Sequence, residues 1–349
     1  MILKTKLFGK VYEFKSLREV MAKANEEKSG DKLAGIAAES AEERVAAKVV
    51  LSHITLEDLR NNPAVPYEED EVTRIIQDGV NEAIYKEIKG MTVAEFREWI
   101  LSETTTTDMI KRASRGLTSE MVAAVCKLMT NLDLIYAAKK IRVSAHCNTT
   151  IGLPGTFSSR LQPNHTTDDP KGIMASVMEG LSLGCGDAVI GLNPVDDSVE
   201  SVARILRSFD EFKNKWEVPT QICVLAHVTT QMEAMDKLGA PIDLMFQSIA
   251  GSQKGNEAFG LNGSILDEGH DMMLHEATST GPNVMYFETG QGSELSSDAH
   301  HGWDQVTMEA RCYGFAKKYS PFLVNTVVGF IGPEYLYDSK QVTRVGLED

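Results

Sequence analysis

From about residue 141 onward, short apolar segments alternate with amphipathic segments at regular intervals. The short segments have the length and composition of buried strands, whereas the segments between them have helical periodicity. Strands that are separated by helices pair in parallel, because each helix returns the chain to the same end of the sheet. We therefore expect a run of six βα units, with strands at 156–159, 187–192, 220–227, 243–248, 283–288 and 322–328.

Polar side chains stand at the end of every expected strand. The carboxyl ends of parallel strands lie on one face of an α/β fold, and that face carries the ligand site. One polar strand end is unremarkable, but a polar residue at all six ends favours a shared site. The residues concerned are Arg160 and Gln162, Asn193, His227 and Thr229, Gln247 and Ser248, Glu288 and Gln291, and Asn325.

The first of these ends, in the segment PGTFSSRLQPN at 154–164, combines a guanidinium with a neutral amide. Arg160 and Gln162 are two positions apart, so their side chains leave a strand on the same side. Pro163 lacks a backbone N–H and ends the strand. The pattern indicates two polar groups that point into one space, and the competing interpretation is a strand end that is simply solvated.

The first part of the chain has a different pattern. Residues 1–15 alternate apolar and polar side chains around Gly9, which predicts a short hairpin. Residues 16–139 are helical in pattern, with helix starts marked by a hydroxyl residue and an acidic residue three positions later, at Ser40, Thr55 and Thr92. We expect a hairpin and helical domain at 1–140, which supports the site or an oligomer, and a catalytic domain at 141–349.

Charge and composition exclude several classes of protein. The net charge is −15, so no basic surface is available to bind nucleic acid. No apolar segment approaches the roughly 20 residues that span a bilayer, and the amino terminus lacks the apolar core of a secretory signal. The five cysteines are scattered and never spaced Cys-x-x-Cys, which is typical of reduced thiols in a cytoplasmic protein.

Common nucleotide and metal motifs are also missing. The sequence has no Gly-x-x-x-x-Gly-Lys-Ser/Thr loop, and GCG at 184–186 and GQG at 290–292 lack the third glycine of the dinucleotide fingerprint. His270 and His275 are five residues apart, which is not the spacing of a zinc-binding helix. The adjacent His300 and His301 diverge, so we expect no metal site.

Seven segments resemble the large subunit family of ethanolamine ammonia-lyase, an adenosylcobalamin enzyme. The resemblance covers essentially the whole chain, and the segments are too long for chance agreement. They are PGTFSSRLQPN at 154–164, GDAVIGLNP at 186–194, CVLAHVTTQ at 223–231, YFETGQGS at 286–293, NTVVGFIGPEYL at 325–336, DKLAG at 31–35 and RNNP at 60–63.

The resemblance implies a fold, a reaction and a set of site residues. The fold is a (β/α)8 TIM barrel preceded by a mainly helical domain, and the reaction is radical deamination of ethanolamine to acetaldehyde and ammonia with adenosylcobalamin. The residues implied to contact the substrate are Arg160, Gln162, Asn193 and Glu288, with Arg160 and Glu288 acting in catalysis. The residues implied to lie against the cobalamin are Pro194, Gln247 and Ser296.

The lower base of the cobalamin is expected to stay bound to the cobalt. Cobalamin proteins that displace this base carry Asp-x-His-x-x-Gly, and the nearest segment here, DAHHG at 298–302, is one residue short of that spacing. The departure agrees with the binding mode of the family.

Partners and location also follow from the resemblance. It implies a small subunit, further copies of the large subunit and a bacterial microcompartment, although no shell-targeting segment is evident. The chain stops at Asp349 where family sequences continue, so we expect a truncated chain that lacks the last barrel strands and an aspartate of the substrate site.

Two other hypotheses remain open at this point. One is a TIM-barrel aldolase or amine-processing enzyme without cobalamin, and the other is an inactive assembly subunit. A Schiff-base aldolase needs a lysine at a strand end, and none of the six ends carries one.

Overall fold

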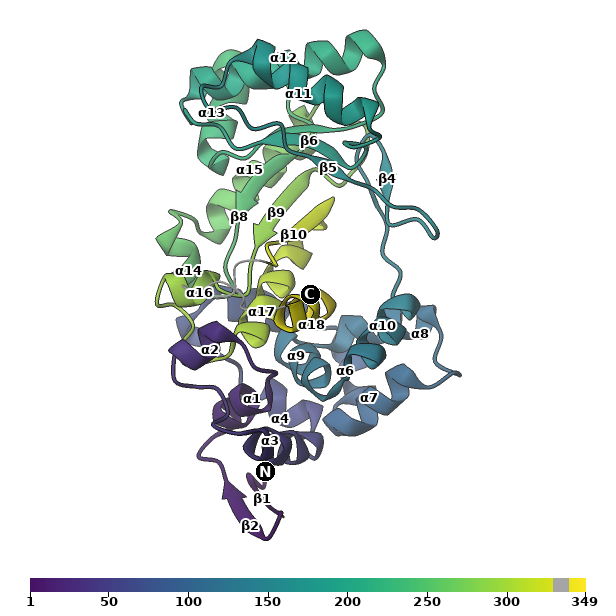
Figure 1. The fold of residues 1–349 in the computed structure, drawn as a ribbon, viewed down its shortest axis with the longest axis vertical. Helices are drawn as coiled ribbons and strands as arrows, with labels where there is room; N and C mark the ends of the chain where they lie inside the picture. Colours follow the sequence, from purple (N-terminus) through teal and green to yellow (C-terminus); the bar gives the residue numbers. More distant parts are fainter. Residues whose placement is uncertain (329–338) are drawn as a thin grey trace.

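The computed structural model describes residues 1–328 and 339–349, and it is a mixed α/β protein (Figure 1). The last part of the NTVVGFIGPEYL segment, residues 329–336, lies outside the described residues. Figure 1 shows the amino-terminal helices at one end of the molecule and the strand-helix repeats at the other, with the first hairpin projecting from the amino-terminal end.

The predicted amino-terminal hairpin is confirmed. Strands β1 (Lys4–Leu7) and β2 (Lys10–Glu13) pair antiparallel, with Leu7 opposite Lys10. The two residues between them, Phe8 and Gly9, both have positive φ values, of 54° and 76°. Positive φ at both positions is the signature of a tight hairpin turn whose twist matches the strands, and glycine adopts it without strain.

Short helices follow the hairpin and pack around an apolar core of their own. They are α1 (Leu17–Ala24), α2 (Ser29–Leu33), α3 (Ala41–Ser52), α4 (Leu56–Arg60), η1 (Tyr67–Glu69), α5 (Glu71–Asp78), α6 (Glu82–Ile88), α7 (Val93–Leu101), α8 (Thr107–Ala113), η2 (Ser114–Gly116), α9 (Ser119–Leu128) and α10 (Asn131–Lys140).

The helix starts predicted from hydroxyl and acidic residues are present. Thr55 and Thr92 each form a complete capping box with the acidic residue three positions later. Ser40 caps α3 by accepting from the Glu43 amide at 3.1 Å, but the Glu43 carboxylate accepts from the Glu39 amide instead of closing the box.

The second part alternates strands and helices as the sequence predicts. Its strands are β5 (Arg160–Leu161), β6 (Val189–Leu192), β7 (Ile222–Val224), β8 (Met245–Ser248), β9 (Met285–Thr289) and β10 (Leu323–Thr326). Its helices are α11 (Pro170–Ser182), α12 (Val199–Trp216), α13 (Val228–Leu238), α14 (Gln253–Ala258), α15 (Gly263–Glu276), α16 (Ser293–Ser296), α17 (Gln305–Ala316), η3 (Lys317–Tyr319) and α18 (Ser339–Glu348).

The strands pair in parallel and in chain order. One sheet has the order β5-β6-β7 and the other β10-β9-β8. The two sheets are linked where the Leu244 amide donates to the Ile222 carbonyl at 3.2 Å. The strands therefore run consecutively from β5 to β10, and within residues 1–328 and 339–349 they do not close into a barrel.

All of the predicted strands after the first are found at the predicted places. The strand predicted at 156–159 is wrong, because β5 begins at Arg160 and residues 156–159 form no ladder. The Ser159 amide donates to the Asp187 carboxylate at 2.7 Å instead of to a strand, and Phe157 is fully exposed. The apolar side chain of Phe157, which suggested a buried strand, is therefore not part of a sheet.

Side chains on the two faces of the strands enter two different cores. One face packs on the helices, through residues such as Ile190, Val224 and Phe287. The alternate residues face an inner cluster that includes Val189, Cys223, Phe246 and Tyr286. These alternate positions fix which side chains can reach the interior enclosed by the strands.

A second small hairpin, which the sequence patterns did not reveal, covers the amino-terminal ends of the strands. It consists of β3 (Ala145–His146) and β4 (Thr150–Ile151). Its turn donates to residues that precede the strands, with the Asn148 side chain bonded to the Thr220 carbonyl and the Thr149 amide bonded to the Gln221 side chain. The strands are thus closed at this end, and their carboxyl ends are left for a ligand.

Helix α17 joins the two parts of the molecule. Val306 and Met308 contribute to the amino-terminal core, whereas Cys312 and Phe315 contribute to the core between strands and helices. Between them Arg311, which is fully buried, donates to Glu120 at 2.6 Å and to Asp70 at 2.8 Å. These ion pairs connect α17 to α9 and to Asp70, the residue that caps the amino terminus of α5.

The Arg311→Met substitution should destabilise the protein by about 3–5 kcal/mol, because it leaves two buried carboxylates without their partner. Urea unfolding followed by circular dichroism would measure the change in free energy. Arg142→Met, at an exposed position, is the matched control and should be nearly neutral. A loss at position 311 no larger than the control would show that the ion pairs do not hold the two parts together.

Candidate functional site

The carboxyl ends of the strands bring polar side chains together on the inner face. The register places Ser248 of β8 and Asn325 of β10 on either side of Glu288 in β9. Tyr286, two residues before Glu288, lies on the same face of β9 and belongs to the inner cluster. The sheet thus aligns three polar side chains in one row with an aromatic hydroxyl behind them.

Arg160 reaches this row from β5. Its Nη1 donates to the Tyr286 hydroxyl and lies 3.2 Å from Oε2 of Glu288, and its Nη2 donates to Oε1 of Gln162 at 2.6 Å. Arg160 and Gln162 therefore do share one space, as their spacing in the sequence predicts. The guanidinium thus links β5 to β9, which belong to different sheets.

Glu288 is held by donors on one of its two oxygens. Oε2 accepts from Arg160 and, at 2.9 Å, from the Asn325 side-chain amide. The side chains of Arg160 and Glu288 are 26% and 24% exposed, so both charges are partly shielded from water but remain accessible. An ion pair of this kind can still admit a charged ligand.

Burial and charge act in opposite directions on Arg160. Partial burial alone lowers the pKa of the guanidinium, but the neighbouring Tyr286 and Glu288 outweigh this effect and raise the pKa above its usual value. Burial raises the pKa of the Tyr286 hydroxyl, with a smaller contribution from Cys223. At neutral pH the Arg160 guanidinium is therefore charged and the Tyr286 phenol is neutral.

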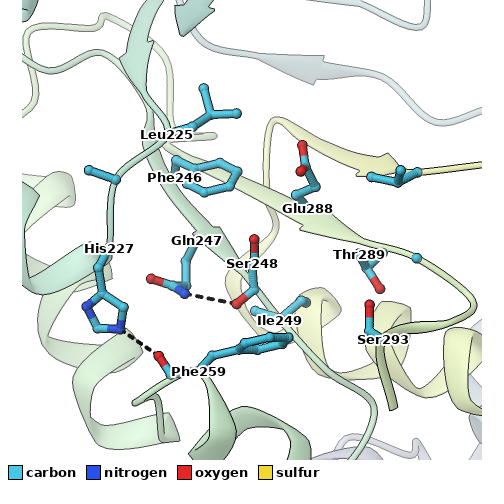
Figure 2. Close-up of a pocket in the computed structure, with 13 residues that line it drawn as sticks. Leu225, His227, Phe246, Gln247, Ser248, Ile249, Phe259, Glu288, Thr289 and Ser293 are labelled. Atoms are coloured by element: carbon cyan, nitrogen blue, oxygen red, sulfur yellow. Dashed lines mark hydrogen bonds between the residues drawn. The ribbon is translucent and has the colours of Figure 1, made fainter. Parts of the chain in front are cut away.

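A cavity of about 550 Å³ lies beside Glu288, at the ends of β7, β8 and β9 (Figure 2). Its lining is mostly apolar, with neutral amide and hydroxyl groups among the apolar side chains and Glu288 at one side. The lining residues are Leu225, Ala226, His227, Phe246, Gln247, Ser248, Ile249, Phe259, Glu288, Thr289, Gly290, Ser293 and Val327.

Two of the polar lining residues have structural partners of their own. Gln247, which is 4% exposed, accepts from the Val228 amide at 2.8 Å and donates to the Ser248 carbonyl at 2.9 Å. His227 caps α13 and contacts the Phe259 carbonyl at 3.1 Å, as Figure 2 shows. These bonds fix the wall of the cavity where β7 and β8 end.

The remaining residues predicted from the resemblance lie apart from this cavity. Asn193 follows β6 and is exposed, and its backbone amide donates to the Asn164 side chain at 2.9 Å. Pro194 and Ser296 are not among the residues that line the cavity. The Ser296 hydroxyl donates to the Gly292 carbonyl within the turn that forms α16.

Tyr286 is the residue of the site that sequence reasoning missed. It lies inside the YFETGQGS segment, but its position in mid-strand gave no sign of polar contacts. The available signal was its spacing of two residues from Glu288, which puts both side chains on one face of the strand. Asn325 was noted as a polar strand end, but no role at Glu288 was predicted for it.

The described part of the chain shows neither a metal-binding cluster nor a membrane-spanning helix. Residues 1–328 and 339–349 contain no group of three or more histidine, cysteine, aspartate or glutamate side chains arranged to hold a metal ion. His270 packs edge-on against Tyr319, with ring centroids 5.5 Å apart. Among the same residues, no helix has the length and apolar character needed to cross a membrane.

The sequence is similar to a known protein family and to several of its members. Residues 12–349 match the family described as ethanolamine ammonia lyase large subunit. The chain is 58% identical over 349 residues to the ethanolamine ammonia-lyase large subunits of Escherichia coli K12 and Salmonella typhimurium LT2. These matches span the whole of this chain and 77% of each relative. The chain therefore belongs to the ethanolamine ammonia-lyase large subunit family.

Proposed function

We propose that this chain binds ethanolamine between Arg160 and Glu288 and converts it to acetaldehyde and ammonia with the help of adenosylcobalamin. The observation that carries the proposal is the partly shielded Arg160–Glu288 pair at the carboxyl ends of the strands, beside a mainly apolar cavity. Family membership supports a carbon-nitrogen lyase that acts on ethanolamine.

The chemistry of the substrate matches the site residue by residue. Ethanolamine carries an ammonium group and a hydroxyl group on neighbouring carbons. Glu288 supplies the negative charge for the ammonium, and Gln162 orients it without adding charge. Arg160 donates hydrogen bonds to the hydroxyl oxygen and to negative charge that develops there. We also assign Asn193 to the substrate, on the strength of the family resemblance.

The cavity fits part of a corrin cofactor. A corrin ring is large and apolar, with amide groups around its edge, and the wall offers apolar side chains with neutral hydrogen-bonding groups between them. Gln247, Ser248 and Ser293 would hold the cofactor here, with Pro194 and Ser296 contacting it outside this cavity. When bound, adenosylcobalamin supplies the organic radical that removes hydrogen from the carbinol carbon.

The residues of the chain then have three tasks. Glu288 and Arg160 hold the two ends of the substrate, so that a single carbon faces the cofactor. The apolar wall, which includes Leu225 and Phe246, excludes water and strengthens the interactions with both charges. The sheet keeps these groups in register, which limits side reactions of a reactive intermediate.

Assembly and location belong to the same proposal. We infer that β5 to β10 are part of a (β/α)8 barrel, which the parallel pairing and the consecutive order of the strands support. We also infer a small-subunit partner, because the relatives are named as large subunits, and an assembly of several large subunits. Family membership supports a place in a bacterial microcompartment.

Ammonia release from ethanolamine tests the proposal directly. The chain, extended by the carboxyl-terminal segment that its relatives carry, would be assayed with adenosylcobalamin and the small subunit of its relatives, beside the Escherichia coli large subunit as a positive control. We expect acetaldehyde and ammonia in equal amounts, and no product when adenosylcobalamin is omitted. Absence of ammonia here, with an active control, would refute the assignment.

The Glu288→Gln substitution should nearly abolish turnover, because it removes the charge that binds the ammonium group. The transition-state free energy calculated from kcat/KM should rise by about 2–5 kcal/mol, the cost of removing one partner of a shielded charge pair. Steady-state ammonia release measures it, with Glu276→Gln at an exposed helix end as control. Turnover close to that of the unchanged chain would remove Glu288 from the mechanism.

The Arg160→Lys substitution should also be severe although it conserves charge. Arg160 serves Tyr286, Glu288 and Gln162 with a planar fork, and one ammonium group cannot reach all three acceptors. We expect kcat/KM to fall, with a loss of transition-state stabilisation of roughly 2 kcal/mol or more, as for the loss of hydrogen bonds to a charged group. Arg142→Lys is the exposed control. Equal kinetics for the two variants would mean that only the charge at position 160 matters.

A further inference from the structure

Tyr286 lies behind the Arg160–Glu288 pair and is held rigidly. It is fully buried in β9, which pairs with β8 on one side and with β10 on the other. Its ring packs edge-on against Phe246, with centroids 5.2 Å apart and an angle of 77° between the ring planes. Such packing fixes the ring, so the position of the hydroxyl is set by the sheet and not by Arg160.

The Tyr286 hydroxyl shares a donor with Glu288. Nη1 of Arg160 donates to this hydroxyl and also lies 3.2 Å from Oε2 of Glu288. A guanidinium nitrogen of this type carries two N–H groups, so it can serve both acceptors. Since Nη2 donates to Gln162, the guanidinium is held by two neutral acceptors and meets the carboxylate through one nitrogen.

The two oxygens of Glu288 consequently differ. Oε2 accepts from Arg160 and Asn325, whereas Oε1 has no donor within residues 1–328 and 339–349. Glu288 lines the cavity, and Figure 2 shows its carboxylate near the end of β9. An ammonium group can bind Oε1 from the cavity without displacing any of the donors to Oε2.

An arginine without these neutral acceptors would not leave Oε1 of Glu288 open. Arginine and carboxylate prefer a parallel fork in which two N–H groups bind both oxygens. If Nη1 had no hydroxyl to bind, Arg160 could turn toward Glu288 and occupy Oε1 as well. That geometry would block the oxygen and bring a second positive charge closer to the ammonium group.

We propose that Tyr286 is a positioning residue that keeps Arg160 on one oxygen of Glu288 and leaves the other oxygen for the ammonium group of the substrate. The inference rests on the proposed function and deepens it, because it names what allows one carboxylate to serve an internal and an external cation together. Asn325 assists by fixing the rotation of the carboxylate through Oε2.

The Tyr286→Phe substitution tests this role, because it removes one oxygen atom and keeps the ring. We expect KM for ethanolamine to rise roughly ten- to hundredfold, as for a lost hydrogen bond to a charged group, while kcat changes little. The inhibition constant of ammonium chloride should rise with KM. A merely structural defect would instead lower kcat and the unfolding temperature together. Tyr136→Phe, on the exposed side of α10, is the control.

Asn325→Leu provides an independent second variant with the same expected direction, since the carboxylate loses the donor that fixes it. Titration calorimetry with ethanolamine measures the affinity without turnover, in the chain with its small subunit and adenosylcobalamin. Weaker binding to Tyr286→Phe supports the positioning role even if the unchanged chain releases no ammonia, a result that would refute only the proposed reaction. Unchanged affinity in both variants would overturn the inference.

Discussion

The buried ion pairs of Arg311 are the constraint on which the rest of the structure depends. A guanidinium without access to water is tolerated only where its donors are matched, and here they are matched by acceptors from three segments of the chain. Nη1 and Nη2 bind Glu120 and Asp70, and Nε donates to the Gly251 carbonyl at 2.7 Å. Gly251 follows β8, so Arg311 ties α17 to the amino-terminal helices and also holds the loop that follows β8.

Asp70 extends this network toward the site. Besides Arg311, it accepts from the amide of Thr73 at the start of α5 and from the amide of Gln253 at the start of α14. One carboxylate thus satisfies the first turns of two helices from different parts of the chain. The amino-terminal helices therefore support the strands through specific bonds as well as through apolar packing, although they contribute no residue to the lining of the cavity.

Periodicity and chain order predicted most of the second part. Strands β6 to β9 were found because their apolar segments are largely buried on both faces, which makes them conspicuous in a sequence. Strand β10 is only half-buried and was found from its short apolar segment. The first strand was misplaced because Phe157 resembles a core residue but is exposed, and because the Ser159 amide bonds to a side chain. The β3–β4 hairpin has only two residues in each strand, too few for a periodic signal.

The site was predictable only in part, for a related reason. The expected strand ends pointed to Arg160, Gln162 and Glu288, because polar residues at such ends are visible in the sequence. Arg160 is, however, the first residue of β5, and its long side chain is what brings it to Glu288. Tyr286 was not identified, because an aromatic residue in mid-strand resembles core packing and only the structure reveals its contact with Arg160. Assignments to the cobalamin, such as Pro194 and Ser296, came from resemblance alone, and nothing in their local sequence pattern points to a ligand.

The two arginines show how the same side chain serves stability and binding. Arg311 is wholly enclosed and bonded to two carboxylates, so its charge is committed to the fold. Arg160 is partly exposed and faces one carboxylate, with neutral partners taking its other donors. A carboxylate fully satisfied by an arginine fork would have little affinity left for another cation. Binding of an ammonium group therefore requires an incomplete ion pair, and the neutral acceptors Tyr286 and Gln162 are what keep this one incomplete without leaving the guanidinium unsatisfied.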